Sequence, residues 1–178
     1  MKNQFNRREF LKQSAAIGAA AAVSSLPIPS VLFGKSLNTG NTISVVNGTN
    51  YFQNTFKALE MLGGINKFVQ KGKTVGLLIN SPFKRRAACT NPDVSLAVLK
   101  MCFEAGAKDV YSIEGATSDY WQRSSQFNSF TSELNRLQHN FKKIKVQISK
   151  GKSLKEAEIS ETLLKCDVFI NIPIVKHH

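Results

Sequence analysis

The chain has 178 residues, the length of a single domain, and 42% of them are hydrophobic, an ordinary share for a globular protein that can fold. Its formal net charge is +12, and after residue 34 there are still 20 basic residues against 11 acidic ones. Such an excess attracts anions of any kind, from phosphates to anionic membranes, but it bears on association and not on chemistry. Length and composition thus fit one globular domain, and the charge alone names no reaction.

The amino terminus carries the most specific pattern, an arginine pair followed by a small-residue apolar run at 15–26. This pattern resembles a twin-arginine export signal, whose residues here are Arg7, Arg8, Phe10, Leu11 and Lys12. An ordinary amphipathic helix is the alternative, and a membrane span is disfavoured because roughly a dozen apolar residues precede Pro27 where about 20 are needed. We expect a signal segment at 1–34, a cleavage site that the sequence leaves open, and a linker at 35–41.

Export by this route predicts a periplasmic protein that meets the twin-arginine machinery and touches a membrane only during export. The route carries folded proteins, often with a cofactor already loaded, but the three cysteines do not identify one. Cys89, Cys102 and Cys166 form no C-x-x-C motif, so neither a zinc nor an iron–sulfur site is indicated. We expect Cys102 and Cys166 in the core. Cys89 follows three basic residues that would lower its pKa, so it is the candidate reactive thiol.

Strand and helix patterns alternate in the first half of the remaining chain. The expected elements are a strand at 42–46, a helix at 52–62, a short helical turn that includes Phe68, a strand at 74–79 and a helix at 92–105. Gly63 and Gly64 should stop the first helix. Asn91 is the expected N-cap of the last one, because Pro92 suits the first helical position.

The second half continues the alternation. The expected elements are a strand at 109–113, a polar turn at 118–125, a helix with an apolar stripe at 127–141, a strand at 143–149, a helix at 153–165 and a strand at 169–174. Ser153 and Glu156 form a capping-box pattern for that last helix. Five strands separated by helices predict an α/β domain at 42–178, a three-layer sandwich with a mainly parallel sheet of about five strands. We expect it to be incomplete, because no helix follows the last strand.

In such a sheet, ligands bind at the carboxyl ends of the strands. The candidate anion-binding residues there are Asn80, Lys84, Arg85, Arg86, Thr90 and Lys176. The loop at 80–91 ends at a helix amino terminus, whose free N–H groups would favour an anion, although a solvated basic loop is an equal alternative. Glu114 lies beside Gly115 past a strand end and could be a base, a metal ligand or simply polar.

The last three residues, Lys176, His177 and His178, offer a cation and two imidazoles, which suit an anion or, with a further ligand, a metal. A histidine pair at the end could also be the remainder of an engineered tag. The catalytic candidates are Glu114, Lys176 and His178, and no metal set is assigned.

Three runs, at 59–80, 90–110 and 166–178, resemble the family called domain of unknown function 362. The matching residues are Gly63, Gly64, Asn80, Thr90, Pro92, Glu114, Pro173, Lys176 and His178. Leu78 and Ile79 depart from the family's usual lysine and proline, which leaves one cationic contact in doubt. The resemblance implies that longer relatives continue past this segment and that some carry iron–sulfur modules, for which this chain has no motif.

The sequence therefore supports two functional classes. The first is an exported enzyme or redox-associated protein that acts on an anionic substrate or cofactor. The second is a non-catalytic periplasmic protein that binds an anion, and an inactive truncated fragment is a further alternative. The expected partners are a small anionic ligand and a missing carboxyl-terminal half or a second copy of the chain. No nucleic-acid partner is expected.

Overall fold

A computed structural model describes residues 42–83, 85 and 87–176, and the chain divides into a unit of residues 1–41 and a unit of residues 42–178. The predicted signal and linker lie outside the described residues. Among the described helices, none is long and apolar enough to cross a membrane.

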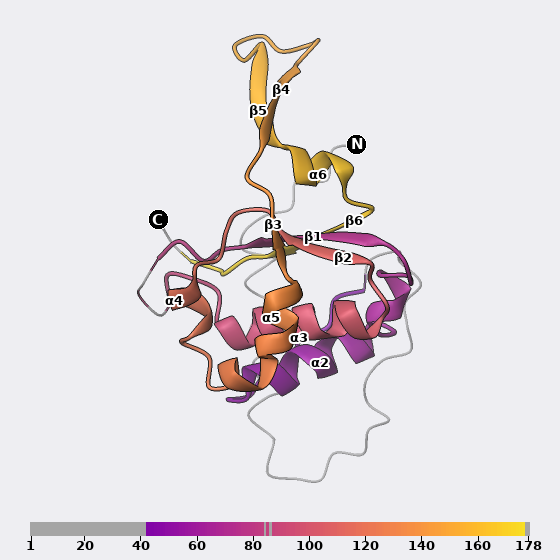
Figure 1. Cartoon of the computed structure of the whole chain (residues 1–178), viewed down its shortest axis with the longest axis vertical. Helices are drawn as coiled ribbons and strands as arrows, with labels where there is room; N and C mark the ends of the chain where they lie inside the picture. Colours follow the sequence, from indigo (N-terminus) through magenta and orange to yellow (C-terminus); the bar gives the residue numbers. More distant parts are fainter. Residues whose placement is uncertain (1–41, 84, 86, 177–178) are drawn as a thin grey trace, which may run out of the picture. The chain divides into compact units, whose positions relative to one another are not determined.

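A parallel sheet of four strands forms the centre of the unit 42–178 (Figure 1). Its strands are β1 (Thr74–Ile79), β2 (Asp109–Ser112), β3 (Gln138–His139) and β6 (Val168–Ile172). Their order across the sheet is β3-β2-β1-β6, and every neighbouring pair is parallel. Each connection therefore has to cross over the sheet, as it does in α/β proteins.

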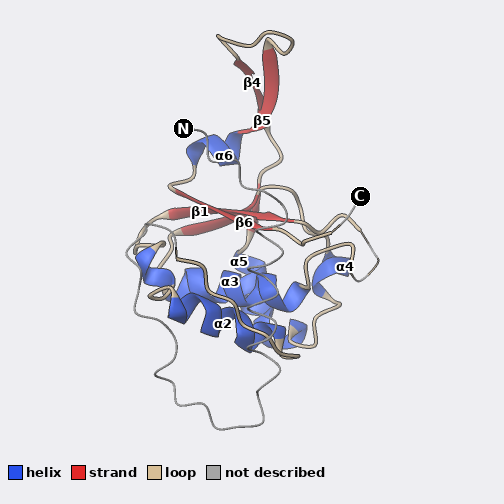
Figure 2. Ribbon diagram, turned by 180° about the vertical axis from the view of Figure 1, so that it is seen from behind, coloured by secondary structure: helices blue, strands red, loops and turns tan. Residues whose placement is uncertain are grey.

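The helices lie on both sides of this sheet. They are α2 (Tyr51–Met61), α3 (Pro92–Glu104), α4 (Ser118–Trp121), α5 (Thr131–Arg136) and α6 (Glu161–Lys165), with short 3₁₀ turns η2 (Ile65–Lys67) and η3 (Phe127–Phe130). Helices α2, α3 and α5 lie on one side and α6 lies on the other in both views (Figures 1 and 2). The predicted α/β class with a mainly parallel sheet is confirmed.

The core lies between the sheet and α3. Alternate residues of β1, Val75, Leu77 and Ile79, point to that side and are at most 1% exposed. Leu96 and Leu99 of α3 are fully buried against them. Helix α3 is apolar on most sides because it packs against the sheet on one side and against α2 and α5 on the others.

Local signals set the helix ends where the sequence predicts them. The Asn91 side chain accepts a hydrogen bond from the backbone N–H of Asp93 at 2.9 Å, so it caps α3, and Pro92 is the first helical residue. Helix α2 ends before Gly63 and Gly64, whose φ angles of 101° and 82° are costly for other residues. The predictions of α2, β1 and α3 are confirmed to within one or two residues.

The predicted strand at 42–46 is wrong. These residues form no ladder, and Ile43 and Val45 are 83% and 80% exposed. A hydrogen bond from the Ser44 hydroxyl to the carbonyl of Ala58 at 2.7 Å holds the segment against α2 instead. Its β-branched residues favour extended backbone, but an extended segment becomes a strand only beside a partner.

The predicted helices at 127–141 and 153–165 are also wrong in part. The first ends at Arg136, so Phe141 lies beyond it and is 63% exposed. In the second region, β5 (Glu156–Ser160) pairs antiparallel with β4 (Lys143–Gln147), and only α6 is helical. The period-two pattern of β5 places Ile159 opposite Ile144, and this pairing overrides the capping-box pattern. The strand predicted at 143–149 exists, but it belongs to this hairpin and not to the parallel sheet.

Strand β6 is an edge of the sheet, because among the described strands it pairs only with β1. An open groove of about 1410 Å³ runs beside it, lined by β6, α2 and the segment 44–48. Phe169 of β6 and Phe68 after η2 are 46% and 44% exposed there. The edge of β6 is thus an apolar surface that no described element covers.

Candidate functional site

The strand order places a topological switch point between β1 and β6. Going from β1 to β2 and β3, the chain moves to one side of β1, and it then returns to add β6 on the other side. In open parallel sheets, ligands bind in the crevice outside the carboxyl ends of the two strands at such a point. Here those ends lead into the described residues 80–83, 85 and 87–91 after β1 and 173–176 after β6, so these segments line the candidate site.

The loop after β1 is closed by hydrogen bonds at its base. The backbone N–H of Thr90 donates to the carbonyl of Asn80 at 2.8 Å, and the Thr90 hydroxyl donates to the carbonyl of Ile172 at 2.8 Å. Thr90 is only 4% exposed, so its two bonds join the ends of β1 and β6 to the start of α3. At the outer turn, Ala87 has a φ of 56°, a left-handed conformation that a non-glycine residue adopts only at some cost.

Lys176 reaches this loop from the end of β6. Its ammonium donates to the carbonyl of Ala88 at 3.1 Å and lies 4.3 Å from the centroid of the Phe83 ring. An ammonium has three donors, so one hydrogen bond leaves two for a ligand. The side chain is half-buried, which favours stronger electrostatic contacts than those of a fully exposed lysine.

Arg123 reaches the same loop from the segment after α4. Its Nη1 donates to the carbonyl of Phe83 at 3.4 Å and to Cys89 Sγ at 3.3 Å, and its guanidinium lies 5.2 Å from the centroid of the Tyr120 ring. Phe83 therefore contacts two cations, Lys176 through its ring and Arg123 through its carbonyl, which are more than 50 residues apart in the sequence.

A cavity of about 250 Å³ opens beside Arg123. Its lining combines one cation, one carboxylate and aromatic rings, from Ser81, Pro82, Phe83, Gly115, Thr117, Asp119, Tyr120 and Arg123. Tyr120 is fully buried, and burial raises the pKa of its phenol, whose oxygen shares a 2.8 Å hydrogen bond with Ser95. Tyr120 therefore stays neutral, and its ring forms part of the cavity wall.

A family model described as Domain of unknown function (DUF362) matches residues 76–178, which is more than half of the chain. The chain belongs to the DUF362 family. No curated protein and no solved structure matches it significantly. The matched range begins at Gly76 within β1 and includes the candidate site and β6, whereas Gly63 and Gly64 lie before it.

Three residues that carry the DUF362 resemblance meet at the switch point. Asn80 directly follows β1, Thr90 bonds the end of β6, and Lys176 contacts the loop between Asn80 and Thr90. Asn80 Oδ1 is buried and has no hydrogen-bond partner among the described residues. An unpaired buried acceptor is costly, so this side chain lowers the stability of the crevice floor.

The other predicted site residues of this DUF362 protein are less informative. Arg85 is exposed on the loop, while Lys84, Arg86, His177 and His178 lie outside the described residues. Glu114 follows β2, and its side chain is exposed. The neighbouring Gly115 lies under the ring of Phe141, which an added Cβ would meet at 2.6 Å, so a side chain and not a ligand explains this glycine.

The expectation that the start of α3 offers free N–H groups is wrong. Pro92 has no N–H, that of Asp93 bonds the Asn91 side chain, and that of Val94 bonds the Asn91 carbonyl at 3.1 Å. Positive charge at the site therefore comes from side chains, and the helix terminus adds no unused donor in its first turn.

The cysteines are free thiols. Burial raises the pKa of Cys102 to about 12, and desolvation also raises that of Cys166, which packs against Gly76. Cys89 is 4% exposed and donates to the carbonyl of Arg85 at 3.5 Å. Within residues 42–83, 85 and 87–176, no group of three or more His, Cys, Asp or Glu side chains could hold a metal ion.

Arg123, Asp119 and Tyr120 are site residues that sequence reasoning missed. They lie in a stretch that the sequence shows only as a polar turn after the third expected strand. Their one signal is position, since that turn follows the carboxyl end of a strand of the sheet.

Proposed function

We propose that this DUF362 protein binds a small anionic ligand, with phosphate or carboxylate chemistry, at the carboxyl ends of β1 and β6. The observation that carries the proposal is the contact of Lys176 with the loop after β1 at the switch point of the sheet. A cation from the far end of the matched region thus meets a basic loop at the place where α/β sheets bind ligands.

Electrostatics supports this proposal. Arg85 lies on the loop after β1, Arg123 and Lys176 reach this loop from two other segments, and the carboxylate of Asp93 is already hydrogen-bonded to Ser124. Two opposite charges about 4 Å apart attract by roughly 4 kcal/mol at an effective dielectric constant of about 20, before desolvation is subtracted. Positive side chains that lie close together repel one another, and a bound anion would relieve this repulsion.

The described residues favour binding over a named reaction. Both functional classes expected from the sequence, an exported enzyme or redox-associated protein and a non-catalytic binding protein, need this anion site. We further propose that Arg7 and Arg8 direct the chain to the periplasm, where the site would meet its ligand. Glu114, Lys176 and His178 stay candidates for catalysis.

Calorimetric titration with phosphate and acetate tests the binding proposal. We expect Lys176→Gln to weaken phosphate binding about tenfold, because a hydrogen bond to a charged group contributes roughly 1.5–3 kcal/mol. Lys143→Gln on β4 removes the same charge away from the site and should leave the affinity unchanged. Equal effects of the two substitutions would mean that only the overall charge attracts phosphate.

A further inference from the structure

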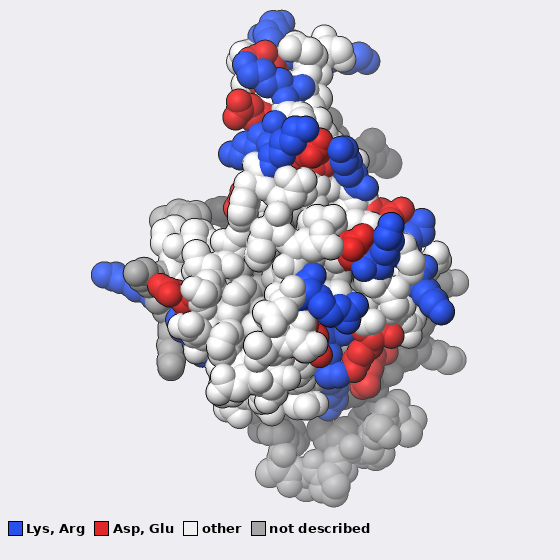
Figure 3. Space-filling model, viewed as in Figure 1, with Lys and Arg blue, Asp and Glu red and all other residues white. Residues whose placement is uncertain are grey.

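The β4–β5 hairpin carries a concentrated positive charge. Residues 142–165 contain seven lysines, three glutamates and no aromatic residue. Figure 3 shows lysine side chains gathered over this hairpin, with acidic ones between them along its stem. The charge excess of the chain is therefore partly local, and it lies outside the anion site described above.

The ion pairs of the hairpin leave its tip positive. Lys145 pairs with Glu156 at 3.2 Å on the stem, and Lys142 and Lys165 pair with Glu161 at its base. The tip, residues 149–155, has Lys150, Lys152 and Lys155 and no acidic residue. Among the described residues, no carboxylate forms an ion pair with these three lysines.

The tip is a closed turn. The backbone N–H of Ile148 donates to the carbonyl of Lys155 at 2.8 Å, and the Lys155 ammonium donates to the carbonyl of Gly151 at 2.6 Å. A Cβ on Gly151 would overlap the carbonyl of Leu154, so only glycine fits at this position. The backbone of the tip is thus held in one shape, which lowers the entropy that binding would cost.

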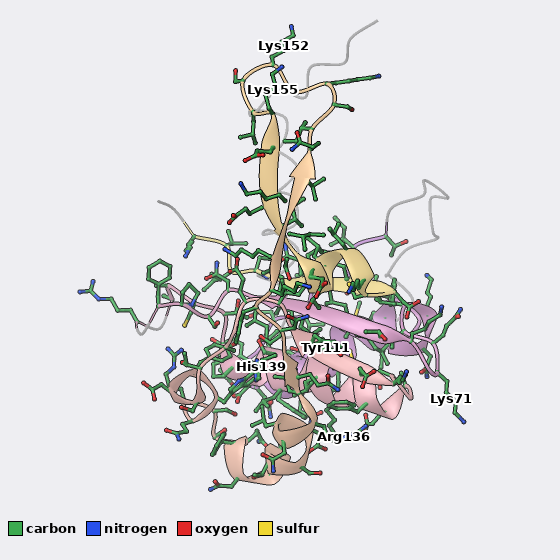
Figure 4. The ribbon with its side chains drawn as sticks, turned by 45° about the horizontal axis from the view of Figure 1, so that its top comes forward. Lys71, Tyr111, Arg136, His139, Lys152 and Lys155 are labelled. Atoms are coloured by element: carbon green, nitrogen blue, oxygen red, sulfur yellow. The ribbon has the colours of Figure 1, made fainter. Side chains whose placement is uncertain are left out.

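This shape exposes an apolar side chain among the cations. Leu154 is 60% exposed, and Lys152 projects from the end of the hairpin, whereas the Lys155 side chain lies against the turn with its ammonium on the Gly151 carbonyl (Figure 4). The basic groups attract an anionic surface, and the leucine gains free energy only if that surface also has an apolar layer. Nucleic acid fits less well, because a single strand is held largely by stacking on aromatic side chains and the hairpin has none.

We propose that the tip of the β4–β5 hairpin docks on an anionic lipid surface. Lys150, Lys152 and Lys155 face the headgroups, and Leu154 enters the interface between headgroups and acyl chains. The contact is peripheral and reversible, since one leucine and three lysines are far weaker than a membrane-spanning helix.

Co-sedimentation of the full chain with vesicles tests this proposal. Vesicles of phosphatidylglycerol and phosphatidylcholine should bind the chain more tightly than vesicles of phosphatidylcholine alone, and added salt should remove the difference. The difference between the two vesicle types isolates the charge effect, because any other apolar segment would bind both. The variant K150Q/K152Q/K155Q should lose about a hundredfold in affinity for the anionic vesicles, roughly fivefold for each lysine.

The matched control is K57Q/K71Q/K108Q, which removes three exposed lysines elsewhere. It should change the affinity by less than about threefold, since charges beyond a Debye length are screened. K150R/K152R/K155R should retain binding, and Leu154→Ala should lose a few-fold. Three results would each overturn the proposal. They are equal losses of affinity in the two triple glutamine variants, equal binding of the chain to both vesicle types, and tighter binding to polyuridylate than to anionic vesicles. Phosphate affinity at the crevice should be the same in all these variants, so failure here is distinct from failure of the anion site.

Discussion

Thr90→Val tests the hydrogen bond that joins β6 to the start of α3. Valine keeps the shape of threonine and removes only the hydroxyl donor, which leaves the carbonyl of Ile172 with the longer bond from the Asn80 N–H at 3.3 Å. A buried polar group that loses its partner costs about 1–3 kcal/mol, and the remaining bond places the expected loss at about 1–2 kcal/mol of unfolding free energy. For a domain of this size, that corresponds to a fall of roughly 3–8 °C in the melting temperature.

Thermal and urea unfolding of Thr90→Val and of a control variant measure this loss of unfolding free energy. Thr55→Val is the matched control, because its hydroxyl donates to the carbonyl of Tyr51 at a similar 2.7 Å but on the exposed surface of α2. We expect the control to lose less than about 0.5 kcal/mol. Equal losses in the two variants would refute the reasoning, since the burial of the Thr90 bond would then contribute nothing. Thr90→Ser, which keeps the donor, should lie closer to the wild type than Thr90→Val.

Three further predictions concern other parts of the chain. Hydrogen bonds from Lys165 and Lys142 lower the pKa of Glu161 from 4.5 to about 2. The contribution of Glu161 to stability is therefore present above pH 4.5 and is lost as the pH falls towards 2. In acid unfolding, Glu161→Gln should lose less stability than the wild type over that pH range. Replacement of Arg7 and Arg8 by lysine should leave the protein in the cytoplasm in a fractionation assay, and unchanged export would contradict the signal. The uncovered edge of β6 predicts concentration-dependent self-association in sedimentation velocity, which Phe169→Lys should reduce; a wild-type chain that stays monomeric at high concentration would show that the edge needs no partner.

Elements with strong local signals could be predicted from the sequence. Strand β1 is a short apolar run bounded by Gly72 and Asn80, and α3 has a complete start signal in Asn91 and Pro92. These patterns act within a few residues, so they are visible without the fold. The crevice followed from them, because the carboxyl ends of parallel strands form a ligand site in this fold class.

Features that depend on distant pairing could not be predicted. Nothing near Ser153 shows that Glu156 will face Gln147 across a hairpin, and the capping-box pattern competes with the alternation of β5. Arg123 has no local motif, and it becomes a site residue only because α4 brings it to Phe83. Phe141 belongs to an apparent helical stripe, but the chain ends that helix earlier and its ring covers Gly115.

The location of the anion is the central claim, and backbone amide NMR during a phosphate titration tests it most directly. We expect the amide resonances of the non-proline residues in 81–91 and 173–176 to shift together with a single affinity, and Lys176→Gln to weaken that affinity. Shifts confined to the hairpin tip at 149–155, or no saturable shift in the two site segments, would contradict an anion site at the carboxyl ends of β1 and β6.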